Sequence, residues 1–157
     1  MTDYTILSEQ LAAFAETDPG CIPLLSNAAA LLWEALPDIN WAGFYLADEA
    51  GLFVAPFQGK PACVRIPFGR GVCGTAFAEE RVLRVPDVHL FPGHIACDAA
   101  SASEIVVPFG KDGRLLGVID IDSPQKDRFT PEDEEGLVRF AALLGQCGDF
   151  SCLEHLR

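Results

Sequence analysis

The chain has 157 residues, the size of about one domain, and half of them are hydrophobic, so we expect a buried core and no long disordered segment. Its 11 Lys and Arg against 23 Asp and Glu give a formal net charge of −12, which argues against nucleic acid and anionic membrane surfaces as partners. The longest apolar stretch, residues 28–33, is far shorter than the ~20 residues of a membrane span. The first residues lack the charged and apolar regions of a signal peptide, so we expect a cytoplasmic protein.

The pattern of apolar residues predicts two helices followed by strands. Helical spacing indicates helices over residues 6–14 and 23–36, and Pro37 ends the second. The period of the apolar residues then changes to two, which is typical of strands. The predicted strands cover residues 41–46, 52–58, 63–67 and 82–85, with a short helix over residues 75–79.

A long loop, a hairpin and a closing helix are predicted for the rest of the chain. Residues 86–103 carry no periodic pattern, and an irregular segment of this length in a compact domain is usually functional. Strands over residues 104–109 and 114–122 pair across a Gly-Lys-Asp-Gly turn. Thr130 and Pro131 begin a helix that fades near Gly145. We therefore predict an α+β fold with a central antiparallel sheet, helices packed on one face and the long loop on the other.

Gly69, Gly71 and Gly74 match the GxGxxG pattern of dinucleotide-binding proteins. That pattern requires the first turn of a βαβ unit and an acidic residue about 20 positions later. Here hairpins surround the glycines and no parallel crossover follows, so the pattern indicates a tight turn into a helix and not a nucleotide site.

Six cysteines are unusual in a chain of this length, and without an export signal we expect them to be mostly reduced thiols. Cys97 lies in the long irregular loop beside His94 and Asp98, where functional residues concentrate. Ordinary packing or adventitious oxidation is the better explanation for three of the others, Cys21, Cys147 and Cys152.

A mixed zinc site is an alternative explanation for some of these cysteines. Its ligands would come from Cys63, Cys73, Cys97, His89 and His94. Their spacing matches no structural zinc pattern, so packing or thiol chemistry remains the better interpretation.

Acidic residues gather on the last predicted strand and its partner. Alternation places Asp120 and Asp122 on one face, together with Leu116 and Val118, and Glu104 opens the neighbouring strand. Three acids near one sheet face would repel one another, which raises at least one pKa and keeps a proton at neutral pH. A solvated strand end is the alternative, but two acids on one face of an otherwise apolar strand favour a functional explanation.

Aromatic residues mark the first predicted strand. Trp41, Gly43 and Tyr45 share one face of it, with the glycine between the two rings. The pair is either ordinary core or the wall of an apolar cage with a hollow at Gly43.

Three segments carry a resemblance to a known family: Gly71-Val72-Cys73-Gly74, residues 94–108 and residues 117–123. Together they resemble free methionine-(R)-sulfoxide reductase, a family of single GAF domains that reduce the free amino acid sulfoxide in the response to oxidative stress. The resemblance implies one GAF-like domain over residues 1–157, in which residues 148–157 form a tail of unassigned role. It also implies a homodimer and chemistry that needs no metal or organic cofactor.

The resemblance also implies roles for individual residues. Cys97 matches the catalytic thiol, and Cys63 and Cys73 match two further cysteines of the redox cycle, of which we favour Cys63 as the resolving one. The acids and aromatic residues match the substrate pocket: Glu104, Asp120, Asp122, Trp41 and Tyr45.

The implied reaction explains these residue types. A protonated acid activates the sulfoxide oxygen, the Cys97 thiolate attacks sulfur, and methionine leaves a sulfenic acid behind. A second thiol then forms a disulfide, which a thioredoxin-type dithiol reduces. Crowded acids raise the pKa of Cys97, so a local group that generates the thiolate is needed, and the sequence does not identify it. The alternatives without turnover are a GAF module that binds a small ligand and a thiol redox sensor.

Overall fold

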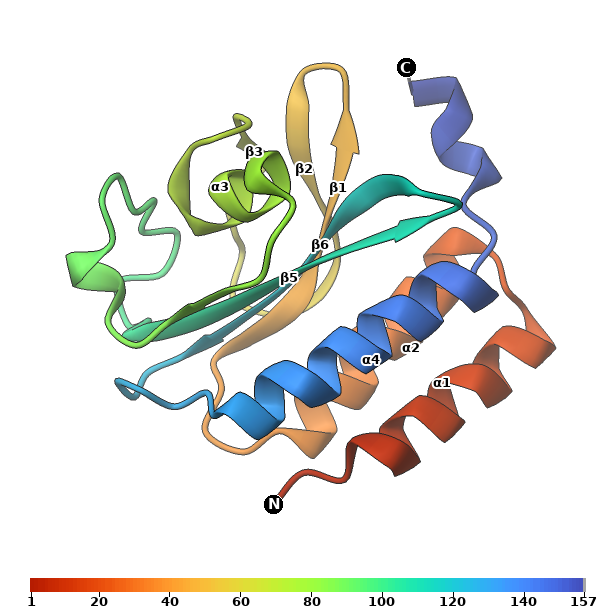
Figure 1. Cartoon of the computed structure of the whole chain (residues 1–157), viewed down its shortest axis with the longest axis horizontal. Helices are drawn as coiled ribbons and strands as arrows, with labels where there is room; N and C mark the ends of the chain where they lie inside the picture. Colours follow the sequence, from red (N-terminus) through yellow and green to blue (C-terminus); the bar gives the residue numbers. More distant parts are fainter. Residues whose placement is uncertain (157) are drawn as a thin grey trace.

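The computed structural model describes residues 1–156 as a curled antiparallel sheet with helices on both faces (Figure 1). Six strands in this part of the chain follow the spatial order β3-β2-β1-β6-β5-β4, and every neighbouring pair is antiparallel. The strands are β1 (Trp41–Asp48), β2 (Gly51–Gly59), β3 (Arg65–Ile66), β4 (Leu83–Val85), β5 (Ser103–Lys111) and β6 (Arg114–Ser123).

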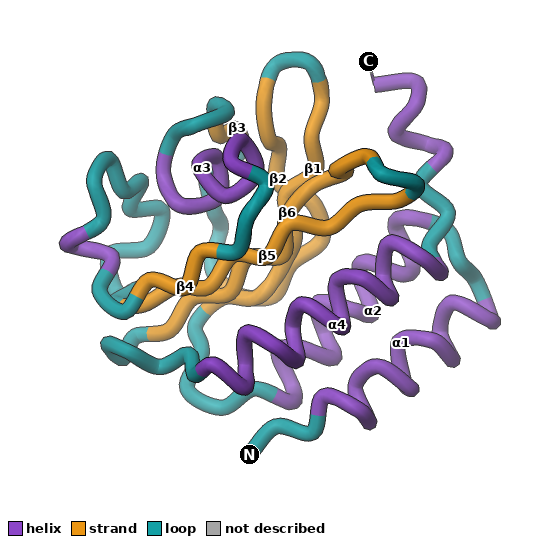
Figure 2. Tube along the Cα trace, viewed as in Figure 1, coloured by secondary structure: helices purple, strands orange, loops and turns teal. Residues whose placement is uncertain are grey.

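Three long helices lie on one side of the sheet, two of them packed on its face and the third on the outer side of those two, as Figure 2 shows. These are α1 (Tyr4–Thr17), α2 (Cys21–Ala35) and α4 (Pro131–Cys147). Their apolar stripes are buried against one another and against the sheet, with Leu24, Leu32 and Phe140 fully enclosed. Helix α4 begins in a capping box, in which the Thr130 and Asp133 side chains each accept a bond from the other's backbone N–H.

A shorter helix, α3 (Gly71–Glu79), lies on the opposite face together with the 3₁₀-helix η1 (Val88–Leu90) and the loop that follows it (Figure 1). A second, smaller apolar cluster fills the space beneath α3. It includes Val72 of α3, Val106 of β5 and Val118 of β6. On this face of the sheet, the candidate site is therefore surrounded by buried apolar residues.

The predicted α+β architecture and the antiparallel sheet are confirmed, with differences in detail. Helix α3 starts at Gly71, not near residue 75, because the missing side chain of Gly74 lets the helix backbone lie close to the carbonyl of Pro67. Strand β3 has only two residues of the five expected, since Cys63 is drawn away by a covalent bond to the loop. Leu116 packs in the helix-side cluster and not with the acids, beyond an irregularity in the β5–β6 pairing.

The chain ends in a second 3₁₀-helix, η2 (Ser151–Leu156). Phe150 and Leu153 from this segment are buried in the helix-side core. Among the helices within residues 1–156, none is long and apolar enough to cross a membrane.

Candidate active site

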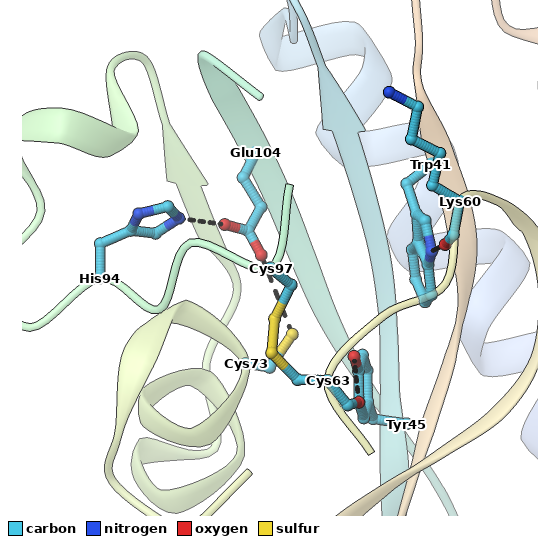
Figure 3. The surroundings of a disulfide bond; sticks show 8 residues. All are labelled: Trp41, Tyr45, Lys60, Cys63, Cys73, His94, Cys97 and Glu104. Atoms are coloured by element: carbon cyan, nitrogen blue, oxygen red, sulfur yellow. Dashed lines mark hydrogen bonds and ion pairs between the residues drawn. A yellow bond between two sulfur atoms is a disulfide. The ribbon is translucent and has the colours of Figure 1, made fainter. Parts of the chain in front are cut away.

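A disulfide joins Cys63, which follows β2, to Cys97 in the long loop, and Figure 3 shows it at the centre of the site. The two Cα atoms are 5.6 Å apart although the residues are 34 positions apart in sequence. The other four cysteines are free, which fits the expectation of mostly reduced thiols, and this pair is the exception. With their sulfurs bonded to each other, these two residues are not available as zinc ligands in this form. Cys63 is the partner that we favoured for Cys97, while the roles of the two residues stay predictions.

The aromatic residues of β1 stand beside the disulfide. The rings of Trp41 and Tyr45 stack with centroids 5.8 Å apart, and Trp41 also stacks at 5.0 Å on Phe57 of β2. Of the two alternatives for this strand face, the hollow at Gly43 is excluded, because Phe57 lies opposite Gly43 in the β1–β2 register and occupies the place of its side chain. Sequence reasoning missed Phe57, whose position opposite Gly43 follows only from the strand register.

Both β1 aromatic residues also hold the segment that carries Cys63. The Tyr45 hydroxyl donates to the carbonyl oxygen of Cys63 at 3.0 Å, and Trp41 Nε1 donates to the carbonyl oxygen of Lys60 at 3.2 Å (Figure 3). These bonds fix the backbone on either side of the turn after β2. Cys63 is thereby placed within bonding distance of the loop.

The three predicted acids come together on the same sheet face. Glu104 and Asp120 are only 5% and 6% exposed, and Asp122 is half-buried. Burial, followed by repulsion from Asp122, raises the pKa of Glu104 to about 8. Burial and Glu104 raise the pKa of Asp120 well above its ordinary value, and burial and Asp120 do the same for Asp122. The cluster therefore keeps protons at neutral pH.

Cys73 of α3 lies against these acids and away from solvent. Its thiol donates to Glu104 Oε1 at 3.9 Å. Burial and the nearby carboxyls, Asp120 first among them, raise its pKa well above the usual range, so the thiol stays protonated. Polar atoms of Cys73, Glu104 and Asp120 lie within 4.8 Å of one another, which is close enough to hold a cation. The raised pKa values oppose that use, because a cation would have to displace the bound protons.

His94 and Asn40 complete the site from the loop and from the residue before β1. His94 Nε2 lies 3.7 Å from Glu104 Oε2, and burial lowers the pKa of this imidazole, so it is neutral at neutral pH. Asn40 Nδ2 donates to Asp98 Oδ2 and to Ser101 Oγ, each at 3.2 Å, and so ties the loop to the sheet. The sequence pointed to His94 through its place beside Cys97 and as a candidate metal ligand, and Asn40 only as part of a segment that resembles the family, without a role.

A cavity opens between the disulfide, the aromatic rings and the acids. It is lined by Trp41, Tyr45, Cys73, His94, Cys97, Glu104, Asp120 and Asp122, among others. In this disulfide-bonded form it encloses about 40 Å³, which is room for a few water molecules. The loop that carries Cys97 forms part of its wall.

Comparison with known proteins accounts for this combination of features. The GAF domain family model matches residues 7–147. Free methionine-R-sulfoxide reductase of Escherichia coli K12 is 54% identical over 141 residues, which cover 90% of this chain and 86% of that protein. The chain belongs to this GAF-domain reductase family.

Other members of the reductase family give the same result. The Saccharomyces cerevisiae free methionine-R-sulfoxide reductase is 50% identical over 130 residues, covering 78% of this chain and 72% of that one. The reduced Staphylococcus aureus fRMsr structure superposes with a TM-score of 0.90 at 51% identity, covering 94% and 96% of the two chains. The Neisseria meningitidis enzyme in complex with its substrate gives 0.87 at 43% identity, covering 92% and 87%. The predicted family and fold are confirmed.

Proposed function

We propose that this protein reduces free methionine-(R)-sulfoxide to methionine by thiol chemistry at Cys97. The observation that carries the proposal is a set of buried, proton-holding carboxyls in the same cavity as the Cys63–Cys97 pair. The protein's membership of a family in which two relatives are named for this activity supports the same conclusion.

The acids would activate the substrate and hold its charge. A sulfoxide oxygen is a poor leaving group until it is protonated, and a carboxyl with a raised pKa supplies that proton at neutral pH. The remaining negative charge on the cluster suits the ammonium of a free amino acid. Trp41 and Tyr45 would provide an apolar surface for the S-methyl group, with Phe57 supporting the Trp41 ring from behind.

Each step of the proposed cycle balances. The Cys97 thiolate attacks the sulfur of the protonated sulfoxide, and the hydroxyl passes from that sulfur to the Cys97 sulfur as the transient S–S bond breaks. Methionine is released, and Cys97 is left as a sulfenic acid. The Cys63 thiol then displaces that oxygen as water and forms the Cys63–Cys97 disulfide. An external dithiol of the thioredoxin type exchanges with this disulfide, is itself oxidised, and returns both cysteines to thiols.

The neutral imidazole of His94 is our candidate for the group that takes the proton from Cys97, because it lines the same cavity on the same loop. Cys73 remains a candidate for a further redox role, although its buried, protonated thiol suits it better to holding Glu104 in place. For the amino acid to enter, the loop must move outward, and reduction of the disulfide releases it to do so.

Turnover distinguishes this function from its alternatives. With thioredoxin, its reductase and NADPH, addition of free methionine-(R)-sulfoxide should consume NADPH in proportion to the substrate and yield an equal amount of methionine. A ligand-binding GAF module would consume none, and a redox sensor would consume one equivalent per protein and stop. Either result would refute the proposal. The homodimer and the cytoplasmic location stay predictions.

A further inference from the structure

A second pair of cysteines meets on the helix-covered side of the sheet, apart from the active-site disulfide. After α4 the chain returns to the start of α2, where Gly20 and Asp149 form a parallel β-bridge. The backbone N–H of Asp149 donates to the carbonyl oxygen of Pro19 at 2.7 Å. Figure 1 shows the C-terminal helical turn lying close to the start of α2. The bridge therefore places Cys21 and Cys152 in neighbouring segments.

Burial of the flanking residues holds these two segments in register. Phe150 and Leu153 are 5% and 4% exposed and belong to the same apolar cluster as Cys21. Cys152 lies between them in sequence and is itself exposed. The segment is thus anchored on both sides of Cys152 while that thiol remains open to solvent.

The two thiols lie in segments that the bridge between Gly20 and Asp149 brings together, and their surroundings differ. Cys21, the first residue of α2, is 5% exposed. Burial, with a hydrogen bond that the Cys21 thiol donates to Cys152 as the next cause, raises the pKa of Cys21 to about 12. A small oxidant can therefore reach the sulfur of Cys152, whereas Cys21 is a buried, protonated thiol in the neighbouring segment.

We propose that Cys21 and Cys152 form a second disulfide when a hydroperoxide oxidises the protein, and that this bond fastens the C-terminal segment to α2. Cys152 attacks the peroxide, whose O–O bond breaks, and becomes a sulfenic acid while one water or alcohol is released. The Cys21 sulfur then attacks the Cys152 sulfur. The thiol proton leaves with the sulfenic oxygen as a second water, and two cysteines have been oxidised by one peroxide.

This bond would act on the stability of the fold and not on the proposed reaction. It would close a loop of more than 100 residues, between the start of α2 and the end of the chain, and long loops give the largest gain from cross-linking. It would also protect Cys152 from further oxidation to sulfinic acid. The inference does not rest on the proposed function, since it uses neither Cys63 nor Cys97.

The test uses the full chain carrying Cys97→Ser, so that the active-site disulfide cannot form. After complete reduction the protein is exposed to hydrogen peroxide, its remaining thiols are alkylated, and its peptides are mapped by mass spectrometry. We expect a linked peptide pair containing Cys21 and Cys152, and a Tm about 5 °C or more above that of the reduced protein. Adding Cys152→Ser should abolish both the link and the rise in Tm.

Cys147→Ser is the matched control, because Cys147 is a partly buried cysteine at the end of α4 in the same region. It should leave the Cys21–Cys152 link intact. A link from Cys152 to Cys147 or to a second chain would overturn the proposal. Sulfinic acid at Cys152 with Cys21 still free to alkylate, or no oxidation of either residue, would overturn it as well.

Discussion

Glu104 on β5 lies directly opposite Asp122 on β6 in the strand register. Asp122 is in turn opposite Trp41 on β1, so two carboxyls and an indole form a row across three strands. Directly opposed residues in a sheet have Cβ atoms only about 4.5–5.5 Å apart. Pairing of the strands therefore forces the acids together and sets them beside the aromatic surface.

Replacing either aspartate of the acid cluster on β6 with its amide should cost activity through lost proton transfer. We expect Asp120→Asn and Asp122→Asn each to lower kcat/KM for methionine-(R)-sulfoxide by about 10²-fold or more, because an amide cannot give up a proton or hold the ammonium by charge. Asp122→Asn also removes a charge that raises the pKa of Glu104, so the alkaline limb of the pH–rate profile should move to lower pH. Asp112→Asn, in the exposed β5–β6 turn, is the control. Unchanged rates and profiles in both variants would make the acids a structural cluster only.

Glu104 should make the protein less stable as pH rises. Its pKa is about 8 in the folded protein against 4.5 as the ordinary value, so the folded state keeps a proton that the unfolded chain releases. The stabilisation from this proton is complete below about pH 4.5 and is lost as pH rises through about 8. Urea unfolding should therefore show a free energy of unfolding that falls between these values. Glu104→Gln should make the decrease in the free energy of unfolding smaller by several kcal/mol, since each unit of pKa shift is worth about 1.4 kcal/mol.

The matched control for this measurement is Glu49→Gln, a change at an exposed carboxylate in the β1–β2 turn. It should leave the pH dependence of unfolding as in the unmodified protein. If Glu104→Gln and Glu49→Gln gave the same slope, the carboxyl of Glu104 would not be holding a proton in the folded state.

The two bonded cysteines should separate the two halves of the reaction. Cys97→Ser should abolish methionine formation with the fold intact, because a hydroxyl is nearly isosteric with the thiol but a far weaker nucleophile. Cys63→Ser should still release one methionine per protein and leave a sulfenic acid on Cys97, detectable with a sulfenic-acid-specific label. Cys147→Ser should behave as the unmodified protein. Retention of even about a tenth of the activity in Cys97→Ser would remove Cys97 from the nucleophilic role.

Substrate choice should depend on the free ammonium group. We expect the N-acetylated sulfoxide and peptide-bound methionine sulfoxide to be poor substrates, because the buried acids would lose their charged partner. The S epimer should also be poor, as the family resemblance implies. Rates measured by methionine release would settle this, and equal rates for the free and the N-acetylated R epimer would contradict a role for the acids in holding the amine.

The sequence allowed prediction of those parts of the site that depend on local pattern. Asp120 and Asp122 share a face because strand side chains alternate, and Glu104 joins them because a short hairpin fixes the register. Phe57 could not be found in this way, since its place opposite Gly43 depends on an irregularity in the β1–β2 pairing. The start of α3 could not be predicted from the sequence because glycine has low helix propensity. In the folded protein, close tertiary contacts override that propensity. The Cys63–Cys97 pair joins segments far apart in sequence, so only the resemblance to a family indicated it.

The hydrogen bond from Tyr45 to the carbonyl oxygen of Cys63 would, under the proposed mechanism, couple substrate choice to regeneration of the thiols. The ring of this tyrosine faces the cavity, while its hydroxyl sets how far the second thiol reaches toward the loop. A redesign that enlarges the pocket at Tyr45, to admit a bulkier sulfoxide, would thus also slow closure of the disulfide. Phe57 stacks on Trp41 but does not line the cavity, so a change there would reach the pocket only through Trp41 and would leave the Tyr45 hydrogen bond intact.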